Sequence, residues 1–292
     1  MHSDPPESFS IDKLISLREA VAVIRPGHVV AVGGVFLARR PFGAIRHLLL
    51  GDVVDLDLVV HSVGIDVDVL VADRRVRSIR HIAVQRGTLG PPPAFTQALG
   101  DGRLEIRDET TVTLGAALRA SMAGVPFLPL MDTGAKIQVD GRSDRATICC
   151  PFSGERVVAV PALRPDVAVV HAHAGDRAGN LWIQGPLGLD AEFVFAANYT
   201  IATVEKVVDG IEGAGRRISG AHVDAIVELP RGAFPSACLP SYRWDLGFTL
   251  AWYDAVREGR GADILERMSV RSYDEFLATA GLRGTGAPSL GV

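Results

Sequence analysis

Short apolar segments alternate with amphipathic segments along the first two-thirds of the chain, and this alternation constrains the fold more than any other feature. Period-2 and fully apolar runs predict strands, whereas apolar residues three to four apart predict helices. Strands are predicted at residues 28–32, 56–61, 79–84, 104–106, 166–173, 181–184 and 200–208. Helices are predicted at residues 10–24, 41–50, 65–73, 90–99, 190–198, 244–258 and 272–280. Strands that alternate with helices favour an α/β fold, here an open, mostly parallel sheet with helices on both faces.

Two regions depart from this rhythm. Residues 147–151 and 156–160 flank the turn Ser153-Gly154 and predict a small β-hairpin insertion. Residues 209–243 contain three prolines and are predicted to be irregular. We predict one α/β domain over residues 10–282, a disordered tail over 1–9 and a loose tail over 283–292. Ser16 and Glu19 have the spacing of a capping box, but they lie inside the periodic run, so we do not start the first helix there.

Composition excludes several classes of protein. The chain has 292 residues, of which 48% are hydrophobic, and this is enough for a large buried core. A net charge of −4 makes nucleic acid an improbable partner. The polar N-terminus does not resemble a signal peptide, and no apolar run approaches the ~20 residues of a membrane helix. Three cysteines without CxxC spacing indicate a reduced, cytoplasmic protein.

Glu105 is the first candidate for chemistry. Residues 104–106 alternate as a half-buried strand does, and the capping residues 108–111 begin a helix that Gly124 ends. This reading puts Glu105 near the carboxyl end of a strand that leads into a helix. Open α/β sheets bind ligands outside those strand ends. Glu105 is therefore either a catalytic carboxylate or an ordinary solvated or capping residue.

A second candidate is the loop that follows the strand at 28–32. Gly33 and Gly34 allow close backbone approach, so the N–H groups of Gly34 and Val35 are candidate donors to an oxyanion. Arg39 and Arg40 are candidate partners of a substrate carboxylate. The loop matches neither GxGxxG nor GxxxxGK[ST], and the alternative is a simple tight turn between strand and helix.

The remaining candidates are weaker. His171 and His173 alternate on one strand face and could bind a metal with Asp176, but two hydrogen-bonded histidines are the commoner case, and we predict no metal. Lys136 could reach a phosphate or could be solvated. The sequence contains no GxSxG, which argues against a serine hydrolase.

Four segments together resemble the α subunits of class I coenzyme A transferases, the family of glutaconate CoA-transferase. They lie at residues 27–34, 118–127, 166–180 and 196–205, and the similarity extends over roughly residues 10–280. The resemblance implies an open, mostly parallel α/β fold. It also implies a β subunit of the same fold, an α2β2 heterotetramer and an active site between the subunits. Coenzyme A (CoA) would be part of the substrate, with no tightly bound cofactor, and Lys136 and Asn180 would be possible CoA or substrate contacts.

Within this family the chain is most similar to the α subunits of heterotetrameric hydrolases that open the last ring in bacterial steroid degradation. There, a glutamate in a strand–helix position of the α subunit is the proposed catalytic residue, and the resemblance assigns that role to Glu105. The implied reaction is hydrolytic carbon–carbon cleavage of a cyclic keto acyl-CoA. Partial burial of Glu105 would raise its pKa and suit it to act as a general base.

Two alternatives stay open. In an ordinary CoA-transferase the nucleophilic glutamate belongs to the β subunit, and this chain would only complete the site. In a non-catalytic CoA-sensing subunit, substrate would bind without turnover. The sequence of the partner and a turnover assay of the combined chains would distinguish the three.

Overall fold

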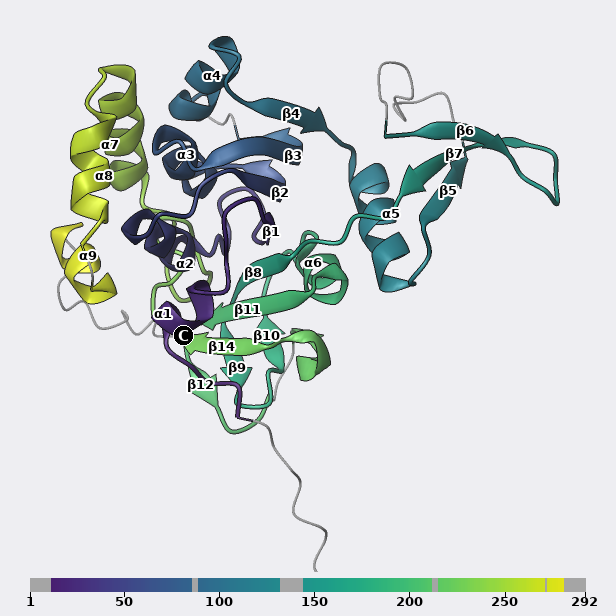
Figure 1. The fold of residues 1–292 in the computed structure, drawn as a ribbon. Helices are drawn as coiled ribbons and strands as arrows, with labels where there is room; N and C mark the ends of the chain where they lie inside the picture. The colour runs from purple at the N-terminus through teal and green to yellow at the C-terminus, as the bar shows by residue number, and fades with distance from the viewer. Residues whose placement is uncertain (1–11, 86–88, 132–143, 212–214, 271, 281–292) are drawn as a thin grey trace, which may run out of the picture.

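A seven-stranded sheet forms the centre of the computed structural model, which describes residues 12–85, 89–131, 144–211, 215–270 and 272–280 (Figure 1). All neighbouring strands run parallel. In spatial order the strands are β14 (Ala225–Glu228), β11 (Tyr199–Val204), β8 (Val167–Ala172), β1 (Val29–Val32), β2 (Leu56–Val63), β3 (Val76–Val84) and β4 (Glu105–Asp108). Every residue of β8 is buried, as expected for an apolar strand covered on both faces.

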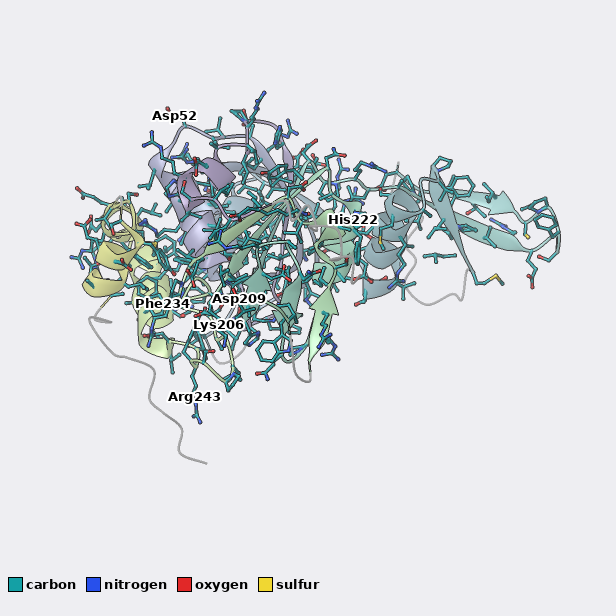
Figure 2. The ribbon with its side chains drawn as sticks, turned by 90° about the horizontal axis from the view of Figure 1, so that it is seen from below. Asp52, Lys206, Asp209, His222, Phe234 and Arg243 are labelled. Carbon is teal, nitrogen blue, oxygen red and sulfur yellow. The ribbon has the colours of Figure 1, made fainter. Side chains whose placement is uncertain are left out.

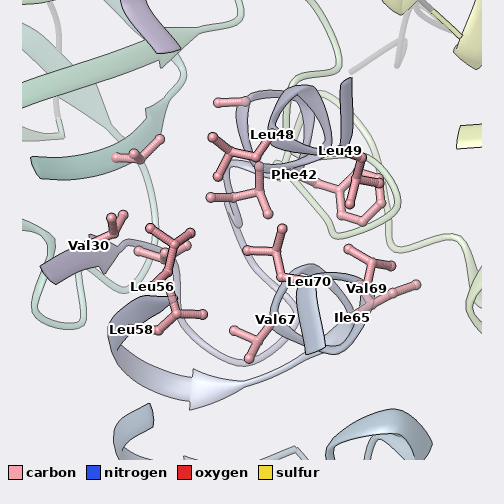
Figure 3. Close-up of a cluster of buried hydrophobic side chains, with 14 of the residues drawn as sticks. Val30, Phe42, Leu48, Leu49, Leu56, Leu58, Ile65, Val67, Val69 and Leu70 are labelled. Carbon is pink, nitrogen blue, oxygen red and sulfur yellow. The ribbon is translucent and has the colours of Figure 1, made fainter. Parts of the chain in front are cut away.

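One face of the sheet packs against most of the helices. Val30, Leu56 and Leu58 from the strands meet Phe42 and Leu70 from the helices in the largest apolar cluster (Figure 3). The helices and turns on this side are α1 (Leu17–Val21), α2 (Phe42–His47), η1 (Leu48–Leu50), α3 (Ile65–Ala72), α4 (Pro93–Gly100), α7 (Leu246–Arg257), α8 (Gly261–Met268) and α9 (Tyr273–Thr279).

The opposite face carries α5 (Thr111–Met122) and α6 (Asp190–Ala196). Leu114 and Phe193 from these helices pack on Ala31, Val59 and Ala168, which alternate along their strands with the residues of the first face. The predicted open parallel sheet with helices on both faces is therefore confirmed. No helix within the described ranges combines the length and apolarity needed to cross a membrane.

Two smaller sheets extend this core. One contains β12 (Val207–Val208), β9 (Ala174–Asp176), β10 (Leu181–Ile183) and β13 (Arg216–Ile218), in that order, with the 3-10 turn η2 at Gly220–His222. The other is antiparallel, has the order β5 (Phe127–Met131), β7 (Arg156–Pro161), β6 (Ala146–Cys149), and projects from the body beside α5 (Figure 1). The predicted hairpin insertion is present as β6 and β7, and β5 adds a third strand.

The N-terminal helix is shorter than predicted. Residues 12–16 are not helical, and Leu14 bridges to Ile226 instead. The Ser16 side chain accepts from the N–H of Glu19, while the Glu19 carboxylate accepts from the N–H of Ser16, which is a complete capping box. The prediction that the helix does not start at this box is therefore wrong, because the apolar period runs through an extended segment as well as a helix.

The region predicted to be irregular contains a strand of the main sheet. β14 is only four residues long and stands just before Pro230, so the prolines that follow obscured it. α8 was also missed. The two predicted tails, 1–9 and 283–292, lie outside the described residues.

A buried acid joins three helices on the larger helical face. Asp68 of α3 is fully buried; its carboxylate accepts from the backbone N–H of Phe95 at 2.8 Å and from Nε1 of Trp252 at 2.8 Å. Burial raises the pKa of Asp68 to about 7, although both hydrogen bonds favour the charged form.

This carboxyl group predicts a pH-dependent stability. Its folded pKa lies above the unfolded value of 3.8, so the folded state retains a proton that the unfolded state loses. The contribution is fully present below pH 3.8 and is lost as the pH rises through about 7, by about 4 kcal/mol at most. We expect Asp68→Asn to flatten this fall in urea unfolding measured from pH 4 to pH 8. An unchanged slope in the variant would rule out Asp68 as its source.

Candidate functional site

The carboxyl ends of the seven parallel strands meet at one edge of the sheet, where α/β proteins bind ligands. Gly33 follows β1, Gly64 follows β2, Glu109 follows β4, His173 follows β8 and Glu205 follows β11. The position of a side chain relative to this edge decides whether it can meet a ligand bound there.

The loop after β1 is a closed turn. The N–H of Gly33 bonds the carbonyl of Val169 at 2.8 Å, that of Gly34 bonds Oδ1 of Asp190 at 2.8 Å, and that of Val35 bonds the carbonyl of Ala38 at 2.9 Å. These three donors are already satisfied within the protein. In this arrangement the three N–H groups are engaged within the protein, as the tight-turn alternative expects, and the oxyanion role of Gly33, Gly34 and Val35 stays a prediction.

Arg39 supports the same turn through Asp190. Its guanidinium contacts Oδ2 of Asp190 at 2.6 Å and the carbonyl oxygens of His171 and Pro186 at 3.1 and 2.5 Å. The Arg39 and Asp190 side chains are 1% and 0% exposed. Asp190 thus ties the guanidinium of Arg39 to the N–H of Gly34.

Arg40 is buried in a second ion pair. Its Nε contacts Oδ1 of Asp66 at 2.5 Å, and Nη2 contacts the carbonyl of Ser62 at 2.8 Å. Both guanidinium groups already have buried protein partners, so the contact predicted between a substrate carboxylate and Arg39 or Arg40 gains no support from this arrangement and stays a prediction. Adjacent arginines after a glycine pair do not reveal from sequence whether they point outward or inward.

Glu105 does not lie where the sequence placed it. It is the first residue of β4 and pairs with Ser78, so it stands at the amino end of the strand, on the edge opposite Gly33. Its side chain is 57% exposed, and Oε1 contacts the guanidinium of Arg107 at 2.9 Å. The predicted position at the carboxyl end and the predicted burial are both wrong. The catalytic role of Glu105 stays a prediction that has lost its positional basis.

Glu109 occupies the junction between β4 and α5 instead. Its side chain is 1% exposed; Oε1 accepts from Arg80 at 2.8 Å, and Oε2 accepts from Thr113 Oγ1 at 2.5 Å and also from Arg145. The sequence identified residues 108–111 only as capping residues, and Thr110 does cap α5. A strand boundary two residues later would have drawn attention to Glu109, because it would have put this carboxylate outside the strand end.

A third carboxylate lies at the ends of β8 and β11. Oε1 of Glu205 is hydrogen-bonded to Nε2 of His171 at 2.8 Å and to the hydroxyl of Tyr242 at 2.5 Å, and Oε2 accepts from the N–H of Arg231 at 2.8 Å. Burial alone would raise the pKa of Glu205, but the bonds from His171 and Tyr242 outweigh it and hold this pKa below its usual value. The neighbouring Lys206 and the loop with Phe234 lie on the same side of the molecule in Figure 2.

This cluster has donor atoms that could hold a metal but is arranged as a hydrogen-bond network. His171, Glu205 and Cys238 have donor atoms within 4.8 Å of one another. Both nitrogens of His171 are engaged, with Thr203 and Glu205, and burial raises the pKa of the Cys238 thiol, which disfavours the thiolate that a metal needs. Glu205 and Tyr242 were not among the sequence candidates.

The alternative metal set of His171, His173 and Asp176 is divided among other partners. His173 bonds the carbonyl of Leu239 at 2.6 Å, and Asp176 accepts from the backbone and side-chain amides of Asn180 at 2.9 and 2.8 Å. The Asn180 side-chain oxygen accepts from the N–H of Gly220. Asn180 therefore holds a turn, and nothing in its contacts points to CoA. Lys136 lies outside the described residues.

The comparisons with known proteins agree with this fold. The sequence pattern of the family described as "Coenzyme A transferase" matches residues 14–229. This chain belongs to the coenzyme A transferase family. The solved structure of a variant of the decarboxylase AibA/AibB is 32% identical, covers 88% of this chain and 98% of that chain, and superposes with a TM-score of 0.80.

Coenzyme A transferase relatives with different activities are equally similar. One subunit of glutaconate CoA-transferase from Acidaminococcus fermentans is 30% identical over 93% of this chain and 92% of its own. The cholesterol ring-cleaving hydrolase IpdA subunit of Mycobacterium tuberculosis is 30% identical over 84% of this chain and 88% of its own. Sequence identity therefore does not separate the transferases from the ring-cleaving hydrolases.

Proposed function

We propose that this chain is the α subunit of a two-chain enzyme that opens the last ring of a steroid-derived cyclic keto acyl-CoA by hydrolytic C–C cleavage. The similarity to the IpdA subunits supports this reaction. The observation that carries the proposal is Glu109, a buried carboxylate on this chain at the strand–helix junction beside the ligand-binding edge.

The proposal includes a second chain. Relatives at 30% identity are named as single subunits of their enzymes, and the AibA/AibB structure is named for two components. We propose a β subunit of the same fold, an α2β2 assembly and a site completed between the subunits.

Glu109 acts as general base in this proposal. Water loses a proton to the carboxylate and adds to the ring ketone. The C–C bond then breaks, its electron pair forms an enolate that the thioester stabilises, and the enolate carbon takes the proton back from Glu109. The products are a new carboxylate and a new C–H bond, with the CoA thioester intact. General-base catalysis of this kind contributes roughly 10²–10⁴-fold to a rate.

The contacts of Glu109 set a condition on this role. Both oxygens are occupied by Arg80, Arg145 and Thr113, so the base is free only after ligand or subunit binding breaks one of these contacts. Arg145 is the best candidate to move, because it belongs to the projecting sheet region rather than to the central sheet.

The same contacts favour a second candidate function. If Glu109 stays bound between Arg80 and Arg145, it has a structural role in the site. The chain would then be the α subunit of a CoA-transferase whose nucleophilic glutamate belongs to the β subunit. The equal similarity to glutaconate CoA-transferase supports this alternative.

Acetate distinguishes the two. The purified α–β complex is incubated with a cyclic steroid-derived keto acyl-CoA, with and without acetate, and the products are identified by mass. Ring opening predicts the gain of one water with CoA still attached, independent of acetate. Acetyl-CoA that forms only with acetate would establish transfer instead.

A further inference from the structure

Phe36 stands in a turn position that normally takes glycine. Residues 35–38 form a tight hairpin turn, because Val35 and Ala38 exchange two backbone hydrogen bonds of 2.9 Å. Phe36 is the first of the two central residues and has φ +46°, the left-handed region that is unfavourable for a bulky side chain. The chain thus holds an aromatic residue in a strained conformation at the ligand-binding edge of the sheet.

The surrounding structure enforces this conformation. Ser62 Oγ accepts from the N–H of Phe36 at 3.0 Å, and Nη1 of Arg40 donates to its carbonyl at 3.2 Å. The next residues are fixed to a second loop, since the N–H of Ala237 bonds the carbonyl of Leu37 at 2.7 Å. The buried pairs Arg39–Asp190 and Arg40–Asp66 hold the base of the turn.

Packing of the Phe36 ring inside the protein offsets little of this backbone strain. It is 49% exposed, and it meets the ring of His61 in an edge-to-face arrangement with centroids 5.4 Å apart. Burial and the charge of Arg40 lower the pKa of His61 below its usual value, which favours the uncharged imidazole beside the Phe36 ring.

We infer that Phe36 contacts the apolar acyl group of the CoA thioester and selects for it. This inference rests on the proposed function only in taking a CoA thioester as the ligand, and it holds for either reaction. Strain that is not repaid by internal packing is expected where a ligand completes the contact.

Binding to the α–β complex tests the inference without turnover. Cyclohexanecarbonyl-CoA, acetyl-CoA and free CoA are titrated by calorimetry into the wild type and Phe36→Ala. We expect Phe36→Ala to weaken cyclohexanecarbonyl-CoA about 10-fold, as for the loss of one apolar contact, and to leave free CoA within about twofold. Leu99→Ala, which truncates a 48% exposed residue of α4, is the matched control and should change neither.

Each other outcome has a clear meaning. Equal weakening of all three ligands, or no weakening, overturns the contact with the acyl group while leaving CoA chemistry intact. Failure of every CoA compound to bind the wild type overturns the proposed function, and this inference with it. Dissociation of the Phe36→Ala complex by native mass spectrometry would make Phe36 a subunit contact and overturn the inference.

Phe36→Gly separates strain from packing. Glycine accepts φ +46° without a steric penalty, so we expect this variant to melt at or above the wild-type temperature while losing the same acyl affinity. Melting of both Phe36→Gly and Phe36→Ala well below the wild type would show that the ring is a structural element and would overturn the inference.

Discussion

Turnover of the α–β complex should fall by about 10²–10⁴-fold in Glu109→Gln, with Glu105→Gln close to wild type. The substitution keeps the shape of the side chain and removes the base. Glu105 is a matched control because it is another glutamate of the same segment, but it is 57% exposed and stands at the other edge of the sheet. Steady-state kcat with the cyclic keto acyl-CoA is the measurement.

A stability control must accompany this variant. Glu109→Gln also removes the negative charge that Arg80 and Arg145 both contact, so some loss of stability is expected. Far-UV circular dichroism, native mass and calorimetric binding of free CoA show whether the complex remains folded. A folded Glu109→Gln complex with wild-type kcat would remove Glu109 from the chemistry, and loss of kcat in Glu105→Gln alone would restore the assignment made from sequence.

The second large effect is on stability. Arg39→Ala should lower the free energy of unfolding by about 3–5 kcal/mol, because it leaves the fully buried carboxylate of Asp190 without its cationic partner. Urea unfolding of the variant is the measurement. Arg103→Ala, which breaks an ion pair whose partners are 40% and 60% exposed, should change it by less than about 1 kcal/mol.

The opposite result would revive the role that sequence suggested for Arg39. If Arg39→Ala unfolds like the wild type but loses affinity for a substrate carrying a free carboxylate, the guanidinium faces the ligand in the working complex.

The fold was largely predictable because its strands are short apolar runs and its helices keep a regular period. β8 is apolar at every position except His171, and the structure buries all six of its residues. The errors arose where short-range pattern was ambiguous. The four-residue β14 stands just before a segment with three prolines, and the capping box at Ser16 was hidden by apolar residues that continued into an extended segment.

The site was less predictable for a geometric reason. Whether a carboxylate lies at the ligand-binding edge depends on where its strand begins and ends. The observed β4 begins one residue and ends two residues later than the predicted strand. This difference places Glu105 at the opposite edge and Glu109 at the ligand-binding edge. The sequence also could not show that the carboxylate of Asp190, far along the chain, accepts hydrogen bonds from the N–H of Gly34 and the guanidinium of Arg39. Glycine pairs and arginines supply possible donors, but only the tertiary contacts decide whether those donors remain available.

Hydrolytic ring opening takes the new carboxylate oxygen from water, so the source of this oxygen is the decisive measurement. The α–β complex is incubated with the cyclic keto acyl-CoA in ¹⁸O-labelled water, and the product is fragmented by mass spectrometry. We expect one labelled oxygen in the new carboxylate, an unlabelled thioester carbonyl and CoA still attached. An intact ring, with the label only in a carboxylate released from CoA, would contradict ring opening. It would show that the thioester had been hydrolysed instead.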